Sequence, residues 1–298
     1  MTTLGPRAVF VARETDYEQL LARHATREQA RFFLETRGQR LEEVEARHDR
    51  FAATLHAARA AVPSDWRQAL VKREDFDRFL FGPEDLVVAV GQDGLVANVA
   101  KYLHGQPVLG INPDPHLYDG VLVRLAAEGL GKMLLRTRGG DVAVERRTMA
   151  RAVMDGGEEL LALNEIFVGH RSHQSARYEI DVPGRHELQS SSGLIVATGT
   201  GATGWARSIM EATGAAIPLR PDDAALGYFV REPFPSVSTG TDIRAGRVEA
   251  GQGVGIVSRL NDGGVIFADG IEKDYLAFGW GRKVEIGIAD RSLNLVVG

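Results

Sequence analysis

The sequence predicts two domains: an α/β domain with a parallel sheet, then a β-rich, sandwich-like domain. As far as about residue 120, short apolar segments alternate with helical patterns, as β-α-β units do. Beyond that point glycines are frequent, helical periodicity is scarce, and short strand-like segments follow one another. A length of 298 residues accommodates two domains, which we place at residues 1–120 and 121–298.

The composition excludes several classes of protein. Without cysteine the chain forms no disulfide, has no thiolate nucleophile and holds no metal through sulfur. A formal net charge of -5 argues against a broad surface for nucleic acid. No apolar run approaches the ~20 residues of a membrane helix, and the N-terminus lacks the apolar core of a signal peptide. We therefore expect a cytoplasmic protein without nucleic-acid or membrane partners.

A strand at residues 7–13 and a long helical run open the first domain. Residues 26–62 contain no proline, and Thr26 and Gln29 have the spacing of a capping box. Two rows of mostly apolar residues repeat every seven positions in this run: Leu34, Leu41, His48 and Leu55, and Val44, Phe51 and Ala58. The rows indicate packing on the protein's own sheet, which we favour, or a subunit interface. We also expect a homo-oligomer, a dimer or a tetramer.

The rest of this domain continues the alternation of strand and helix. The predicted elements are a strand at 66–74, a helix at 76–81, a strand at 85–90, a helix at 95–103 and a strand at 106–115. Residues 85–90 (DLVVAV) are apolar after the first, as in a strand buried on both faces. The elements therefore predict a parallel sheet with helices on its faces.

The second domain consists mainly of short predicted strands separated by turn residues. They lie at residues 176–182, 192–198, 253–260, 263–270, 283–290 and 293–298. One helix is predicted to start near Thr203 and to contain the sequence GWARSIMEAT. This pattern is typical of an antiparallel β-rich domain.

The corner between the strand at 85–90 and the following helix carries a lone acid, Asp93, between Gly91 and Gly94. Ligands of open α/β sheets bind at the carboxyl ends of the strands, where glycine and a helix start favour a phosphate. Asp93 could accept a proton from an attacking hydroxyl or hold Mg²⁺; the alternative is a turn or helix-capping residue. The sequence has no Walker P-loop, no kinase-type glycine loop and no G-x-G-x-x-G after the first strand.

Three further segments accompany this corner. They are GINPDP at residues 110–115, LNEIFVGH at 163–170 and SSGLIVATGTGATGWARSI at 191–209. In this order, the four segments resemble the motifs of the NAD kinase family, and most closely those of its mitochondrial-type branch. FADG at residues 267–270 is similar to the late Asp-Gly turn of that family. The resemblance covers about residues 86–290, whereas the first eighty residues match in type only.

The resemblance implies a Rossmann-like N-terminal domain, a β-rich C-terminal domain and a kinase that transfers a phosphoryl group from ATP, or polyphosphate, to the 2′-hydroxyl of NAD, with Mg²⁺ assisting. It makes Asp93 the base for that hydroxyl and assigns no protein metal ligands. The other site residues that it implies are Gly91, Gln92 and Gly94 at the phosphates, Asn112 and Asp114 in the next turn, Asn164 and Glu165 at the adenosine, and Thr198, Thr200 and Gly201 along NAD.

The sequence departs from the family pattern at two positions of the corner. Gln92 replaces a glycine and Leu95 a threonine. If the backbone at residue 92 is in the left-handed conformation, a side chain there lowers stability by ~1–2 kcal/mol. The Gln92 side chain would either obstruct a phosphate or donate a hydrogen bond to it, and Leu95 lacks a hydroxyl for phosphate or metal. The helix by which the family returns to its first domain is not evident before Gly298.

Two alternatives to an NAD kinase follow from these motifs. One is a kinase of another hydroxyl substrate, since the corner also resembles that of the diacylglycerol and sphingosine kinases. The other is a nucleotide-binding protein without catalysis, which the replacements at Gln92 and Leu95 favour. The Asn164–Glu165 pair and the Thr-Gly-Thr-Gly segment favour NAD over a lipid.

Overall fold

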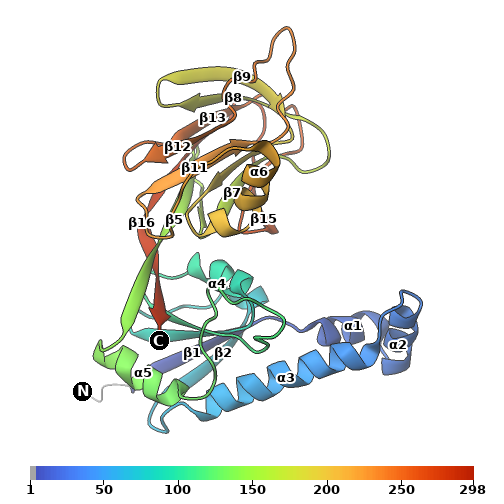
Figure 1. Ribbon diagram of the computed structural model, residues 1–298, viewed down its shortest axis with the longest axis vertical. Helices are drawn as coiled ribbons and strands as arrows, with labels where there is room; N and C mark the ends of the chain where they lie inside the picture. The colour runs from blue at the N-terminus through green and yellow to red at the C-terminus, as the bar shows by residue number, and fades with distance from the viewer. Residues whose placement is uncertain (1–4) are drawn as a thin grey trace. The chain divides into compact units, whose positions relative to one another are not determined.

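The computed structural model describes residues 5–298, which form two compact units (Figure 1). The first unit runs to Glu145 and includes the chain end, Asn294–Gly298, while the second is Arg146–Leu293. The boundary between the units therefore lies after Glu145, whereas the sequence pattern places it at residue 120. The reason is helix α5 (Leu130–Gly139), which packs on the first unit's sheet through the buried side chains of Leu130 and Leu134.

The sheet of the first unit is parallel throughout. Its strands, in spatial order, are β2 (Arg67–Lys72), β1 (Arg7–Ala12), β3 (Asp85–Val90), β4 (Pro107–Ile111) and the last part of β16 (Lys283–Val297). Every residue of β3 is buried, as its apolar run predicts for a central strand. The chain returns to this sheet as a strand, because Asn294 and Leu295 pair with Pro107 and Val108.

Helices cover both faces of this sheet. The helices α3 (Leu41–Ala60) and α5 pack on the face that carries Phe10 and Leu109. The opposite face is covered by α4 (Asp93–Ala100), which contacts β1, β3 and β4 (Figure 1). Side chains of successive strand residues point to opposite faces, so a strand apolar throughout is buried by helices on both sides. The predicted Rossmann-like arrangement is confirmed.

The long helical run divides into separate helices. After α1 (Asp16–His24) come α2 (Arg27–Glu35) and α3, and Gly38, with φ +69°, lies in the turn between the last two. Thr26 forms the N-cap half of the predicted capping box, accepting the N–H of Gln29 at 3.2 Å. The three helices share a small core: Ala30, Leu34, Leu41 and Val44, with Tyr17, Leu20, Leu21 and Phe33 against it. The apolar rows thus pack within the chain's own fold.

The prediction of a helix at residues 76–81 is wrong. A single 3₁₀ turn, Arg73–Asp75, is followed by a turn and irregular backbone. Phe76 and Phe81 are both buried, with ring centroids 6.4 Å apart in an edge-to-face arrangement. The aromatic side chains therefore fill the core from irregular backbone, which a short apolar run does not distinguish from a helix.

The second unit is a sandwich of two sheets. One contains β16, β13 (Val254–Ser258), β8 (Ala176–Val182) and β9 (Arg185–Ser191), with β5 (Ala143–Met154) pairing both β16 and β6 (Glu159–Ala162). The other is antiparallel, in the order β12 (Ala245–Glu249), β11 (Ala225–Val230), β10 (Leu194–Ala197), β7 (Glu165–His170), β14 (Gly264–Ala268) and β15 (Ile271–Ala277). This confirms the predicted β-rich fold.

The core of this unit lies between the two sheets. Tyr178 and Ile256 from one sheet belong to the same buried cluster as Ile166 and Val196 from the other. Helix α6 (Trp205–Thr213) covers the outer face of the antiparallel sheet through Ala206. The strands expected at residues 283–290 and 293–298 form one strand, β16. No helix within residues 5–298 is both long enough and apolar enough to span a membrane.

Candidate functional site

The predicted site residues form two clusters, one in each unit. The first unit holds Gly91, Gln92, Asp93, Gly94, Asn112 and Asp114. The second holds Asn164, Glu165, Thr198, Thr200 and Gly201. Within each unit, residues far apart in the sequence are brought together.

The corner after β3 is built without backbone strain at Gln92. Gly91 has φ +156°, and a Cβ added there would lie 3.1 Å from the Leu95 side chain. Gln92 precedes α4 with φ -97° and ψ 167°, an extended conformation open to any residue. The left-handed penalty considered for Gln92 therefore does not arise. Leu95 is only 3% exposed, so its side chain belongs to the core and not to a phosphate-facing surface.

The Asp93 carboxylate is held by three backbone donors. Its Oδ1 accepts the N–H groups of Leu122 at 2.7 Å and Val123 at 3.2 Å, and its Oδ2 accepts that of Val121 at 2.9 Å. A carboxylate offers about four lone-pair sites, so one site, on Oδ2, remains for another donor. Asp93 thus anchors a distant segment, as a structural turn residue would, and retains one position at which a hydroxyl proton can be accepted.

Two glycines allow residues 121–123 to approach this closely. A Cβ at Gly110 would lie 2.1 Å from the Leu122 carbonyl oxygen, and one at Gly120 would lie 2.7 Å from that of Val123. Gly120 also has φ +69°. The sequence prediction missed this segment, and its one signal was the Asp119–Gly120 pair, a common turn dipeptide.

The turn after β4 is closed by its own side chains. Asn112 accepts the N–H of Asp114 at 3.0 Å and donates to the Tyr118 carbonyl oxygen at 2.9 Å. Asp114, 8% exposed, accepts Nε and Nη2 of Arg50 on α3 at 2.9 and 2.6 Å. Asn112 therefore fixes the conformation of the turn, and Asp114 joins the turn to α3.

A pocket opens at the carboxyl edge of this sheet. Its walls are the segment after β1, the middle of α3, Gly91 and Gln92, and the turn with Asp114. The carboxyl ends of β1, β3 and β4 meet there because these strands are parallel neighbours. Ligands of open α/β sheets bind at this edge. Arg13, Arg47 and His48 also line the pocket, and the sequence prediction did not include them.

In the second unit, Thr198 fixes the Thr-Gly-Thr-Gly turn. Its buried hydroxyl donates to the Leu163 carbonyl oxygen at 2.5 Å and accepts the N–H groups of Thr200 and Gly201 at 3.1 and 3.2 Å. A Cβ at Gly201 would lie 2.1 Å from the Asn164 carbonyl oxygen. The hydroxyl is occupied within the fold, so Thr198 shapes the turn against the Asn164 backbone.

Asn164 presents the most available polar group of this cluster. Asp269, in the late Asp-Gly turn, accepts the N–H groups of Leu163 at 3.0 Å and Asn164 at 2.7 Å, so the backbone is fixed. The half-buried amide side chain of Asn164 makes no hydrogen bond to any residue from 5 to 298. Its neighbour Glu165 is 9% exposed. This amide can therefore meet a ligand without first breaking an internal contact.

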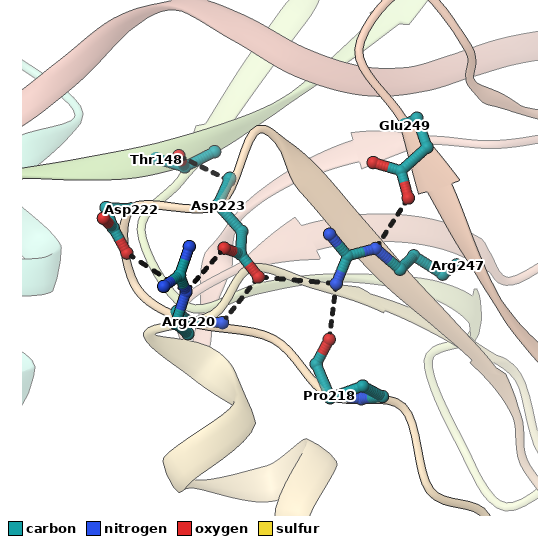
Figure 2. A network of polar contacts seen from close by, with 7 residues as sticks. All are labelled: Thr148, Pro218, Arg220, Asp222, Asp223, Arg247 and Glu249. Carbon is teal, nitrogen blue, oxygen red and sulfur yellow. Dashed lines mark hydrogen bonds and ion pairs between the residues drawn. The ribbon is translucent and has the colours of Figure 1, made fainter.

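A polar network supports the other side of the turn (Figure 2). A Cβ at Gly199 would lie 1.8 Å from the Arg220 carbonyl oxygen, so this loop packs directly on the turn. Asp223 accepts the backbone N–H and the Nε of Arg220, both at 3.0 Å. Arg247 donates to the Pro218 carbonyl oxygen at 2.5 Å and lies 3.4 Å from Asp223. The backbone N–H of Arg220, followed by its guanidinium, lowers the pKa of Asp223.

Strand β5 contributes two adjacent residues to the same region. Thr148 donates to the Asp223 carbonyl oxygen at 2.8 Å, and the buried Arg147 lies with Nη1 3.3 Å from the Thr200 hydroxyl. Sequence reasoning missed both, because β5 also contains Glu145, Arg146 and Arg151, and its sequence does not single out Arg147 as the buried one. Together they hold the turn and its supporting loop on one strand.

The described residues do not build a Mg²⁺ site at the corner. Residues 5–298 contain no cluster of three or more His, Asp or Glu side chains arranged to hold a metal. Asp93 is engaged by backbone N–H groups and Asp114 by Arg50. Mg²⁺ bound to nucleotides takes few protein ligands and keeps waters and phosphates. We therefore assign no step to a metal held by the protein.

No family model matches the sequence. Similar proteins include the mitochondrial NAD kinase 2 of Homo sapiens, 30% identical over 186 residues, which are 47% of this chain and 42% of that protein. The NAD kinase of Magnetococcus marinus is 32% identical over 170 residues, 54% of either protein. The chain thus spans about half the length of the curated relatives that it matches.

Solved structures share the fold over almost the whole chain. An NAD kinase from Archaeoglobus fulgidus in complex with ATP superposes with a TM-score of 0.60 at 20% identity, covering 98% of this chain and 93% of its own. Yeast NADH kinase complexed with NADH gives 0.60 at 15%, covering 99% and 84%. The molecule is thus a two-domain protein with a glycine corner at the edge of a parallel sheet. By sequence it is similar to proteins named NAD kinase over about half of their length.

Proposed function

We propose that the protein is an NAD kinase, which transfers a phosphoryl group from ATP, or from polyphosphate, to the 2′-hydroxyl of NAD. The observation that carries the proposal is the homology to proteins named NAD kinase, together with a glycine corner and a partner-free Asn164 at the positions that their motifs imply. NADP and ADP are the products expected with ATP.

In this reaction the hydroxyl oxygen attacks the terminal phosphorus while the bond to the leaving phosphate breaks. The hydroxyl proton passes to Oδ2 of Asp93, where one lone-pair site remains. A positioned general base contributes ~10²–10⁴-fold. The three backbone hydrogen bonds to Asp93 fix the orientation of the carboxylate, so little further entropy is lost when it is positioned for the proton transfer. Gly91 and Gln92 border the start of α4, whose backbone N–H groups phosphate oxygens can approach, whereas the N–H of Gly91 itself donates to the Ile111 carbonyl oxygen at 3.0 Å.

The second unit supplies recognition of NAD. Asn164 and Glu165 would hydrogen-bond the adenosine, since an amide and a carboxylate offer donors and acceptors to its polar edge. Thr198, Thr200 and Gly201 shape the turn along the ligand, because their polar groups are held within the fold. Mg²⁺ would enter with the donor phosphates, whose charge it neutralises.

A nucleotide-binding protein without catalysis is the second candidate. It is favoured by the structural use of Asp93, whose two carboxylate oxygens already anchor residues 121–123. In that case NAD would bind through the second unit and no phosphoryl group would be transferred.

An enzyme-coupled assay of NADP formation distinguishes the two. Wild-type protein is incubated with NAD, Mg²⁺ and either ATP or polyphosphate, and calorimetry measures NAD and ATP binding separately. We expect NADP with at least one donor. NAD binding without NADP from either donor would support the non-catalytic candidate and reject the kinase.

A further inference from the structure

We infer that the pocket at the carboxyl edge of the first unit's sheet is a polyphosphate site in which Arg13 and Arg47 bind the phosphate chain of the donor. The donor's identity rests on the proposed function, whereas binding of a phosphate chain does not. The site extends the glycine corner with a residue of the segment after β1 and a residue of α3, for which the sequence motifs assign no role.

The pocket's walls come from four segments of the first unit. Arg13 follows β1, and Arg47 lies on α3 between Val44 and Phe51, which also line the pocket. Residues at these spacings share one face of a helix, so α3 presents its basic residue to the same cavity as its apolar ones. Gln92 and Gly91 form another wall. A phosphate in the pocket would therefore meet an arginine-bearing side and the corner.

The charged side chains that line the pocket include arginines that no acid in the described part of the chain pairs with, which favours binding of an anion. Glu14 is paired with Lys72 at 3.2 Å and Asp114 with Arg50 at 2.6 Å. Arg13 and Arg47 are both half-buried and form no ion pair or hydrogen bond among residues 5–298.

One acid in the lining, Asp16, also has no such partner, but it lies in the first turn of α1, where the helix N-terminus stabilises it. The lining therefore has two unpaired arginines against one acid. Two like charges facing one cavity repel each other, and a phosphate chain would relieve this repulsion. The planar guanidinium is suited to bidentate contact with phosphate oxygens.

Contacts within the N-terminal helices hold α3 in place for this role. The Nδ1 of His48 lies 2.8 Å from the Thr15 hydroxyl, and Thr15 caps α1 through a capping box with Glu18. Arg50 joins α3 to the turn after β4 through Asp114. The helix is thus tied, just after Arg47, to the segments that follow β1 and β4, so the backbone that carries this arginine is fixed before a ligand binds.

The test is calorimetry with inorganic tripolyphosphate, which carries the phosphate chain without a base or sugar. Wild type is compared with Arg13→Gln and Arg47→Gln, and with Arg59→Gln as a control for charge. Arg59 is exposed on the same helix and lies outside the pocket. We expect each pocket variant to weaken binding about tenfold or more, the loss from one charged hydrogen bond, and the control to stay within twofold.

Arg13→Lys and Arg47→Lys retain the charge and should keep most of the affinity, and thermal melting confirms that each variant folds. The inference is overturned if wild type does not bind tripolyphosphate, or if both glutamine variants bind it as wild type does. Loss of binding in the variants of a protein that makes no NADP would support the site and reject the kinase. NADP formation with an unchanged KM for ATP in both variants would reject the site and keep the kinase.

Discussion

The two candidate clusters differ in what their polar side chains do. In the first unit, Asp93, Asn112 and Asp114 are all engaged by the fold, whereas Arg13 and Arg47 form no hydrogen bond or ion pair with residues 5–298. In the second unit, Thr198 is engaged, whereas the Asn164 amide has no hydrogen-bond partner in the described part of the chain. The difference shows that a residue in a ligand-site motif can serve by shaping backbone as well as by contacting the ligand.

Asp93→Asn should have the largest effect on activity. The substitution removes the base and should lower NADP turnover by ~10²-fold or more. It also places an amide nitrogen against at least one of the backbone N–H groups that the carboxylate accepts, so stability should fall by ~1–3 kcal/mol. Turnover is measured at saturating NAD, and stability by urea denaturation.

Asp262→Asn, an exposed loop substitution, is the matched control and should change neither quantity. NAD affinity should stay within a few fold in Asp93→Asn. Full NADP formation by this variant would remove the general-base role and leave Asp93 as an anchor alone.

Thr198→Val tests the shaping role within the second unit. Valine keeps the volume but leaves the N–H groups of Thr200 and Gly201 without their acceptor. We expect a loss of about 2 kcal/mol in the free energy of unfolding, from unpaired buried donors. Thr54→Val, at a half-buried position of α3 where the hydroxyl donates only to the Arg50 carbonyl oxygen of its own helix, should stay within about 0.5 kcal/mol. Equal stability of the two variants would contradict the hydrogen bonds assigned to Thr198.

Asn164→Ala should show the opposite pattern. Because its amide has no partner among the described residues, its removal should leave the unfolding midpoint nearly unchanged. NAD binding should weaken by about two- to tenfold, the equivalent of one neutral hydrogen bond of ~0.5–1.5 kcal/mol. Calorimetry with NAD measures this, with Asn261→Ala in an exposed turn as the control. An unchanged dissociation constant in a folded variant would argue against Asn164 as a ligand contact.

Local pattern predicted the fold well where burial repeats along the chain. The β3 strand is apolar on both faces, and Ala176–Val182 alternates, so each was located from sequence. The strand β16 was predicted as two because the polar residues Arg291 and Ser292 interrupt the apolar pattern, although the strand continues through them. Helix α5 was missed because glycines flank and interrupt it, at Gly129, Gly131, Gly139 and Gly140.

The site was located but its internal contacts were not. The partners of Asp93 lie 28 to 30 residues further along the chain, and Arg50 lies 64 residues before Asp114. No local spacing encodes such contacts, since they depend on which strand ends meet at the sheet edge. The unpaired Arg47 likewise becomes visible only when α3 is placed beside β1 and β3.

The smallest effect is expected for a substitution at the glycine corner, Gln92→Gly, and concerns the KM for ATP. Gln92 has an extended backbone and lines the pocket, so its side chain can reach a phosphate without strain. If its amide donates one hydrogen bond to the donor, Gln92→Gly should raise the KM for ATP by about two- to tenfold. Glycine is accepted before a helix, so the fold should lose less than about 1 kcal/mol. Gln39→Gly, in an exposed turn away from the pocket, is the control. A lower KM in Gln92→Gly would mean that the glutamine obstructs the phosphates and that the pocket binds the donor without a contribution from this side chain.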